Sequence, residues 1–295
     1  MALRTNISER QRRLGAELRR LRDKAGMTLG TAAAAAGFTA PHLSHIEAGR
    51  TAVATDRLIA LTRAYGCRNA PYVDALVAMS EANGKGWWSS YRNRLPQTAL
   101  NLAELEANAE LVRNHESLFV PGLFQTESYM RAVFTSLRPG CSSEEIEEFT
   151  AFRLRRQTIL DGDGAPTVHA VVHEAALHMH IGGPDVMEKQ LLHLVALARR
   201  PGISIQIIPY RAGAYAAFSG AFLHLVPRVE ELGTVLVDHP AQALYLGDED
   251  HLKQYSEMFD KLVRHALPPI APGEQSGTHK GKDSLGLLQH ILYTL

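Results

Sequence analysis

The spacing of apolar and polar residues divides this chain of 295 residues into a helical first part and a mixed second part. Up to about residue 160, apolar residues recur every three to four positions, the period of a helix buried on one side. From residue 167 on, short β-branched runs stand between helical stretches and indicate strands. The pattern predicts helices at 9–25, 29–36, 40–48, 55–65, 70–83, 126–137, 142–160, 174–178, 185–200 and 248–266, and strands at 168–172, 203–208, 222–226, 234–237 and 243–246.

This pattern predicts a mainly α N-terminal domain joined to an α+β C-terminal domain. The run Asn83-Gly84-Lys85-Gly86 breaks the helical pattern, and we expect the domain boundary there. The expected domains are residues 1–83 and 84–268, followed by a polar linker and an apolar amphipathic tail at 269–295. Residues 100–115 fit a helix, or a strand followed by a helix.

Residues 28–50 predict two short helices joined by a tight turn. Thr28 is a suitable N-cap for the first helix, and Gly37 can adopt the left-handed conformation that ends it. Thr39 is a suitable N-cap for the second helix. Two helices around a glycine turn form the plan of a helix-turn-helix DNA reader, although a generic helical hairpin has the same outline.

The second of these helices has one apolar face and one polar face. Leu43 and Ile46 lie three residues apart and can face inward, while His42 and His45 share a different face. Ser44 is expected to be structural, as is Glu47. We expect the major groove to be read by Thr39, Ala40, His42 and His45, and phosphates to be held by Thr28, Arg50 and the basic residues of the first helix.

The flanking sequence extends the likeness to a known family. Roughly the first 66 residues resemble the repressor/Cro-like (XRE-type) regulators of bacteria, through Leu14-Gly15, Leu18, Leu21-Arg22, Gly26, Ala33, Gly37, Ser44, Ile46-Glu47 and Gly49-Arg50. The chain departs from that family at Leu29, where a glutamine commonly supports DNA contacts. The expected partner is double-stranded DNA, and we expect a homodimer because such readers pair two half-sites about 34 Å apart.

The distribution of charge agrees with DNA contact at one end of the chain. The net charge is zero, but residues 1–68 contain 12 basic and five acidic residues, a net charge of +7, balanced by −7 on residues 69–295. A basic module on an acidic remainder suits nucleic-acid binding at one end. A solvated arginine-rich helix face would give the same count.

Composition limits the class of protein. The content of hydrophobic residues, 45%, supports two folded cores, and Cys67 and Cys141 are few enough for a reducing cytoplasm. No run of 18 or more apolar residues predicts a membrane span, and the first residues lack the apolar core of a signal peptide. We therefore expect a cytoplasmic, nucleoid-associated protein.

Two groups of residues in the second part are candidates for binding a partner or a ligand. Trp87, Trp88 and Tyr91 form an aromatic cluster that can anchor a partner, or can pack the start of the second domain. Tyr210 and Arg211 follow a predicted strand in a loop that can line a pocket. A plain loop is the equal alternative.

The histidines of the second part are candidate metal ligands. His173 and His178 flank Glu174, but they are five residues apart, and a zinc-protease helix needs its two histidines four apart. His169 and His173 share a strand face without an evident further ligand. No Gly-x-Ser-x-Gly motif or phosphate loop is present. We therefore expect no metal, no cofactor and no enzymatic activity.

The second part also resembles a known group of proteins. The segments that carry the resemblance are Trp87-Trp88-Ser-Ser-Tyr91, Pro121 to Arg131, Arg153 to Gln157, His173 to Leu177, Gly182 to Leu191 and Ile208 to Phe222. With them the whole chain resembles the WhiJ-like regulators of filamentous high-GC bacteria. The resemblance implies a transcriptional regulator of development or secondary metabolism, with a sensing and partner-docking C-terminal domain. It also implies a small acidic BldB-like partner protein.

Two other functions stay open at this point. In the first, the chain is a protein-interaction module that acts mainly through its acidic C-terminal domain. In the second, which the histidine spacing makes weaker, that domain is a metal-dependent enzyme. The dependence of binding on salt separates the first alternative from DNA binding, because each phosphate contact adds to the salt dependence.

Overall fold

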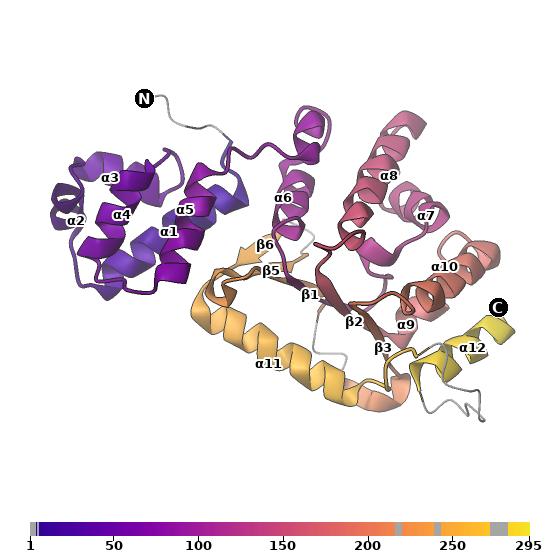
Figure 1. Cartoon of the computed structure of the whole chain (residues 1–295). Helices are drawn as coiled ribbons and strands as arrows, with labels where there is room; N and C mark the ends of the chain where they lie inside the picture. The colour runs from indigo at the N-terminus through magenta and orange to yellow at the C-terminus, as the bar shows by residue number, and fades with distance from the viewer. Residues whose placement is uncertain (1–3, 5, 216–219, 239–242, 272–282) are drawn as a thin grey trace. The chain divides into compact units, whose positions relative to one another are not determined.

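The computed structural model of the chain describes residues 4, 6–215, 220–238, 243–271 and 283–295. The chain divides into two compact units, Met1–Leu105 and Glu106–Leu295. The first unit is helical, and the second contains a six-stranded mixed sheet with helices around it (Figure 1). The predicted combination of an all-helical N-terminal region with a mixed C-terminal domain is confirmed.

The first unit is built from short helices whose ends coincide with local capping signals. Ser8 and Gln11 form a reciprocal capping box at the first helix, and Asn69 caps the fifth. The helices are α1 (Glu9–Lys24), α2 (Leu29–Ala35), α3 (Ala40–Glu47), α4 (Thr55–Ala64), α5 (Ala70–Glu81) and α6 (Gln97–Glu106), with a 3₁₀ helix η1 (Trp87–Tyr91).

The core of the first unit is formed by leucines from successive helices. Leu18 of α1, Leu43 of α3, Leu58 and Leu61 of α4, and Leu76 of α5 have no exposed surface. These are the positions that the helical spacing placed inward. Burying each of these side chains stabilises the fold by roughly 2 kcal/mol.

Residues 84–105 pack with the first unit, whereas the sequence analysis expects the boundary after residue 83. Arg10 of α1 donates from Nε to Oε1 of Glu104 at 2.7 Å, and both side chains are buried. The backbone N–H of Glu9 donates to Oδ1 of Asn101 at 3.4 Å. These contacts join α6 to α1, across the segment at which the sequence analysis expects the domain boundary.

The second unit is organised around a sheet with the strand order β3-β2-β1-β4-β5-β6. The first three strands are parallel, and the last three add in antiparallel fashion beside the first. The strands are β1 (Leu111–Glu116), β2 (Thr167–His173), β3 (Ile203–Ile208), β4 (Phe222–Val226), β5 (Thr234–Val237) and β6 (Leu244–Leu246).

Strand β1 was not predicted at its place. The sequence favours a helix, or a strand before a helix, over residues 100–115, whereas the structure has helix α6 first and strand β1 after it. The strand contains polar residues where a central strand usually has apolar ones. Asn114 donates from Nδ2 to the carbonyl oxygen of Phe222 at 3.2 Å, and Nδ1 of His115 lies 2.9 Å from the carbonyl oxygen of Val171. These tertiary hydrogen bonds make burial possible.

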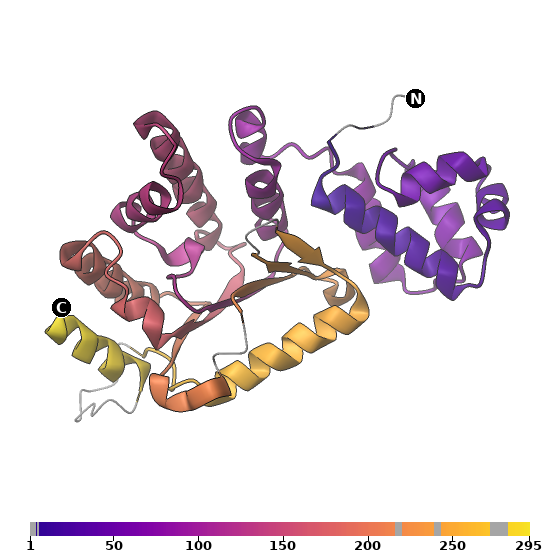
Figure 2. The same ribbon diagram turned by 180° about the vertical axis from the view of Figure 1, so that it is seen from behind.

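Helices lie on both faces of the sheet (Figures 1 and 2). One face is covered by α7, α8 and α10, and the other is crossed by the long helix α11. The helices of this unit are α7 (Glu127–Leu137), α8 (Ser143–Gln157), α9 (Glu174–His178), α10 (Pro184–Leu197), α11 (Glu249–His265) and α12 (Ser284–Thr294), with 3₁₀ helices η2 (Gly122–Phe124), η3 (Thr158–Leu160), η4 (Tyr210–Tyr215) and η5 (Glu230–Leu232).

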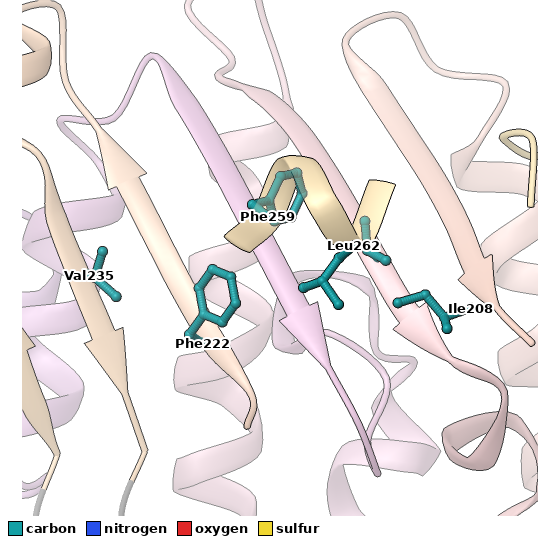
Figure 3. Packing of buried hydrophobic residues seen from close by; sticks show 6 residues of the cluster. Ile208, Phe222, Val235, Phe259 and Leu262 are labelled. Carbon is teal, nitrogen blue, oxygen red and sulfur yellow. The ribbon is translucent and has the colours of Figure 1, made fainter. Parts of the chain in front are cut away.

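The core under α11 joins side chains that are far apart in sequence. Phe259 and Leu262 of α11 point toward Ile208, Phe222 and Val235 on three strands (Figure 3). The rings of Phe222 and Phe259 meet edge to face, with centroids 6.3 Å apart. This packing fixes α11 across the sheet.

The C-terminal helix α12 belongs to the second unit. It buries Leu285, Leu288 and Ile291. The hydroxyl of Ser284 accepts a hydrogen bond from the backbone N–H of Ile207 at 2.9 Å, at the outer edge of β3. The amphipathic tail expected from the sequence is therefore docked on the domain. Part of the expected linker lies outside the described residues.

Candidate nucleic-acid interface

Helices α2 and α3 form the predicted helix-turn-helix. The hydroxyl of Thr28 accepts from the N–H of Thr31 at 3.2 Å, and the hydroxyl of Thr39 accepts from the N–H of His42 at 3.4 Å. Gly37 has φ +68°, which ends α2 in the left-handed conformation. The two caps and the glycine turn stand where the sequence placed them.

The turn between the two helices is held by Arg57 of α4. Its Nη1 donates to the carbonyl oxygen of Ala36 at 2.6 Å, at the C-terminus of α2, where a positive charge is favoured. Its guanidinium also stacks over Phe38, 5.8 Å from the ring centroid. This exposed arginine therefore has a structural role, although its charge alone would suggest phosphate binding.

The outward face of α3 presents small and hydrogen-bonding side chains. Leu43 and Ile46 are buried against the unit, so the helical period turns the opposite face to solvent. Thr39 is exposed, whereas His42 and His45 are partly buried. The predicted reading residues Thr39, Ala40, His42 and His45 thus lie in the first two turns of one helix.

Sequence reasoning missed two hydroxyl groups on this surface. Ser44, which was expected to be structural, is exposed in the middle of α3. Thr31 is exposed in the first turn of α2, and its hydroxyl lies 3.0 Å from that of Thr28. The helical period counted from the buried Leu43 and Ile46 could have placed Ser44 outside.

Arg50 follows the C-terminus of α3 and is exposed. Its carbonyl oxygen accepts from the N–H of Arg4 at 3.0 Å, and Nη1 of Arg4 donates to the carbonyl oxygen of Gly49 at 3.1 Å. Burial and the charge of Arg10 lower the pKa of Arg4. The backbone after α3 is therefore fixed, while the Arg50 side chain can reach a phosphate.

Most basic residues of the first helix are not available to phosphates, which corrects the sequence expectation. Arg13 has its Nε 3.1 Å from Oε1 of Glu17, and Arg20 has its Nε 2.8 Å from Oε2 of the same carboxylate. Arg22 is held by Glu47, and Arg10 is paired with a buried glutamate of α6. Three carboxylates therefore compensate most of the charge of these four arginines inside the first unit, Glu17 being shared by two of them. Arg12 and Arg19 are the more exposed arginines of α1.

The aromatic residues of η1 pack on one another. The ring centroids of Trp87 and Trp88 lie 6.0 Å apart, and those of Trp87 and Tyr91 lie 6.2 Å apart, both edge to face. The Arg94 guanidinium lies 4.6 Å from the centroid of the Tyr91 ring. All three aromatic side chains are partly buried. They belong to the first unit, whereas the sequence analysis expects them in the C-terminal domain.

Tyr210 lies at the carboxyl end of β3 with 55% of its surface exposed. Its backbone N–H donates to Oε2 of Glu174 at 2.7 Å. Its ring stacks on His178 at 5.8 Å and meets His173 edge to face at 5.4 Å. The neighbouring Arg211 is exposed as well. The predicted pair is thus on the surface at one edge of the sheet.

Two of the histidines considered as metal ligands, His169 and His173, have structural partners. His169 lies 2.7 Å from Oε1 of Gln206, and Nδ1 of His173 accepts from the N–H of Ala175 at the start of α9. Burial lowers the pKa of both imidazoles. Among the described residues, no group of three histidine, cysteine, aspartate or glutamate side chains is arranged to hold a metal ion.

Comparisons with known proteins agree with this division. A helix-turn-helix domain model matches residues 13–75, and the model of a domain of unknown function (DUF5753) matches residues 100–271. No curated protein and no solved structure matches the chain. In the part of the chain that the structure describes, no helix has both the length and the apolar character needed to cross a membrane. The chain belongs to the family of the domain of unknown function DUF5753, and carries in front of it a helix-turn-helix DNA-binding domain.

Proposed function

We propose that the protein is a sequence-specific transcriptional regulator that binds double-stranded DNA as a homodimer through α3. The observation that supports this most strongly is that α3 has a polar face toward solvent and an apolar face buried in the first unit. Its outward face presents small and polar side chains, while its inward face is fixed by buried leucine and isoleucine. Such a helix can enter a major groove without rearrangement.

The contacts divide into positioning and reading roles. Arg50 and the exposed first turn of α2 around Thr28 are placed to hold phosphates, and backbone N–H groups at that helix start favour an anion. Thr39, Ser44 and His45 can hydrogen-bond to base edges, and Ala40 can contact a thymine methyl group. None of these side chains forms the bidentate arginine–guanine pair, so discrimination rests on several weak contacts.

The finer parts of the proposal come from the resemblance to WhiJ-like regulators. They are control of development or secondary metabolism, and regulation through the C-terminal domain by a small BldB-like partner or a ligand. DNA binding implies that the protein works beside the chromosome in the cytoplasm. The proposal includes no catalytic step and no cofactor.

Binding of the full chain to duplex DNA at different salt concentrations tests the proposal. Each phosphate contact contributes about −0.9 to the slope of log K against log salt, so a dimer should give a slope of roughly −4 or steeper. Fluorescence anisotropy of labelled genomic fragments measures it. A slope near zero would exclude phosphate contacts as the source of affinity.

A protein-interaction module is the second candidate function. It is favoured by the internal ion pairs of Arg10, Arg13 and Arg22, which reduce the charge that the first unit offers to DNA. In that case an apolar partner surface supplies the affinity, and salt has little effect. The same titration therefore decides between the two candidates.

A further inference from the structure

A polar cluster lies on the α8 side of the sheet, at the carboxyl end of β1. Glu116 ends this strand and is partly buried. Its carboxylate accepts a long hydrogen bond, 3.5 Å from Nδ2 of Asn114, and that amide is closer to the carbonyl oxygen of Phe222, at 3.2 Å. Desolvation by the surrounding protein raises the pKa of Glu116 to about 8; the negative charge of Asp238 acts in the same direction, while the hydrogen bond from Asn114 and the charge of Arg153 act against it. The group is thus desolvated and weakly partnered, yet retains some solvent-accessible surface.

Arg153 of α8 is the nearby group of opposite sign. Its Nη1 donates to Oε1 of Gln125 at 2.5 Å, and its guanidinium lies 4.3 Å from the ring centroid of Phe134. Its Nε is buried and has no hydrogen-bond partner among the described residues. Burial lowers the pKa of Arg153 to about 10, the charge of Arg156 acting in the same direction. A buried donor without a partner is costly and indicates that something else completes the site.

Other arginines of this chain show which groups the Nε–Nη2 edge of a guanidinium binds. Arg22, Arg131 and Arg156 each use Nε and Nη2 together to hold both oxygens of a glutamate. This planar fork matches the geometry of a carboxylate. In Arg153 no described residue pairs with the corresponding Nε, although Glu116 is close enough for the two charges to interact.

The position in the fold also favours a ligand. In sheets with parallel strands, ligands bind at the carboxyl ends of the strands, where the connections leave in different directions. From β1 the chain passes to β2 on one side, and the antiparallel β4 later adds on the other side. Glu116 ends the strand at which this change of direction occurs.

We propose that Arg153 and Glu116 form the two ends of a binding site for a small amino acid. The carboxylate of the ligand binds the Nε–Nη2 edge of Arg153, and its ammonium group binds Glu116. This deepens the proposed regulator function, on which it rests for its biological meaning, by naming the chemical class of the effector. The chemistry covers α-amino acids and ω-amino acids, which the test distinguishes.

The site has a second, independent signature in proton release. Without a ligand the Glu116 carboxyl keeps its proton up to about pH 8. An ammonium group beside it favours the carboxylate, so binding at pH 7 should release about one proton per ligand to the buffer. An arginine and a glutamate with only structural roles would give no such release.

The test uses the full chain without DNA. The probes are the common α-amino acids, β-alanine and γ-aminobutyrate, each with its methyl ester and its N-acetyl derivative. We expect at least one amino acid to raise the melting temperature, and both of its derivatives to bind at least tenfold more weakly. Calorimetry in buffers of different ionisation enthalpy then measures the proton release.

Variants separate the site from general stability. Arg153→Gln and Glu116→Gln should each weaken binding at least tenfold, and Glu116→Gln should abolish the proton release. Arg153→Lys keeps the charge without the fork and should also bind more weakly. Arg131→Gln is the matched control, because it removes a carboxylate-holding arginine at the exposed contact between α7 and α8, and it should bind as the wild type does.

The proposal is overturned if no amino acid shifts the melting temperature, if inorganic phosphate binds equally well, or if Arg153→Gln binds as tightly as the wild type. DNA binding is measured separately on the same samples. A protein that binds the amino acid but not DNA would refute the regulator function alone. Intact DNA binding without amino-acid binding would refute the effector site alone.

Discussion

Arg22 of α1 holds Glu47, the last residue of α3, through two hydrogen bonds: Nε lies 2.7 Å from Oε1, and Nη2 lies 3.0 Å from Oε2. The two side chains keep only 11% and 6% of their surface exposed. The hydrogen bond to Glu47 raises the pKa of Arg22. The pair joins α1 to the C-terminal end of α3. It therefore helps to fix the orientation of α3, the helix proposed to enter the major groove.

Replacing Glu47 by glutamine should therefore destabilise the first unit by about 2 kcal/mol, because the guanidinium loses its buried counter-charge and keeps only the more exposed carboxylate of Asp23, 2.7 Å from its Nη1. DNA affinity should fall as well. The effect is indirect, because the Glu47 side chain is directed at Arg22 and acts through the orientation of α3. Urea unfolding followed by circular dichroism gives the change in stability, and anisotropy gives the change in DNA affinity.

The matched control is Glu147→Gln. Glu147 accepts the same pair of hydrogen bonds from Arg131, but on the exposed surface between α7 and α8. Exposed pairs contribute little, so this variant should unfold and bind DNA as the wild type does. Equal losses in both variants would show that burial of the Arg22–Glu47 pair is unimportant.

Two glycines inside helices should respond in opposite ways to alanine. At Gly15 of α1 a Cβ atom would lie 2.4 Å from the carbonyl oxygen of Glu47, so Gly15→Ala must push α3 away and should cost about 3 kcal/mol. At Gly30 of α2 the nearest atom is 3.9 Å away, and Gly30→Ala should stabilise by about 0.5–1 kcal/mol. Thermal unfolding of both variants checks this. A tolerated Gly15→Ala would contradict the close packing of α1 on α3.

Arg50→Gln should weaken DNA binding about equally for all sequences and make the salt slope shallower by about 0.9, because it removes a phosphate contact. Arg63→Gln is the control, since Arg63 is an exposed arginine of α4 outside the two helices of the motif. Titrations at several salt concentrations measure both slopes. Equal slopes for Arg50→Gln and the wild type would remove Arg50 from the interface.

Glu116 makes stability fall as the pH rises. Its pKa is raised from 4.5 to about 8 in the folded chain, so between these values the folded state binds the proton that the unfolded state has released. The contribution of Glu116 to the free energy of unfolding is fully present below about pH 4.5 and is lost as the pH rises to about 8. Glu116→Gln should remove about 2 kcal/mol of this decline, less than the full shift because partial exposure screens the charge. Urea unfolding at pH 5 and pH 8.5 measures the difference, and an unchanged decline would contradict it.

His224 of β4 makes stability fall as the pH is lowered. It is buried with 5% exposure, its Nδ1 has no hydrogen-bond partner among the described residues, and burial with the nearby Arg113 lowers its pKa to about 4. Between pH 6.5 and pH 4 the unfolded state binds a proton that the folded state does not, so stability falls on acidification.

The variant His224→Leu should therefore lose about 2–3 kcal/mol less than the wild type between pH 7 and pH 4. The comparison concerns this pH dependence, since leucine also changes the packing at neutral pH. His290→Leu, at an exposed position of α12, should behave as the wild type does. A parallel pH profile for His224→Leu and the wild type would show that His224 titrates normally.

The helix-turn-helix was predictable because its signals are local. Thr28, Thr39 and Gly37 act on backbone groups within three residues, and the inward face of α3 follows from Leu43 and Ile46 alone. The exposure of Ser44 follows from the same helical period, counted from Leu43 and Ile46.

Strand β1 and the interhelix ion pairs of the arginines in α1 could not be predicted, because their partners are distant in sequence. Asn114 is satisfied by a carbonyl group 108 residues away, and Arg10 finds its carboxylate 94 residues away. The charge count therefore overstated the phosphate-binding capacity of α1. The proposed ligand site has the same origin, since Arg153 and Glu116 come from different elements that only the fold brings together.

The central claim is tested most directly by sequencing the genomic DNA fragments that the full-length protein retains, beside an Arg50→Ala/His42→Ala double variant. The account predicts a palindromic motif with half-sites about one helical turn, roughly 34 Å, apart. It also predicts that the double variant loses the motif. Equal recovery by both proteins, or no enriched sequence for the wild type, would contradict sequence-specific binding through α3.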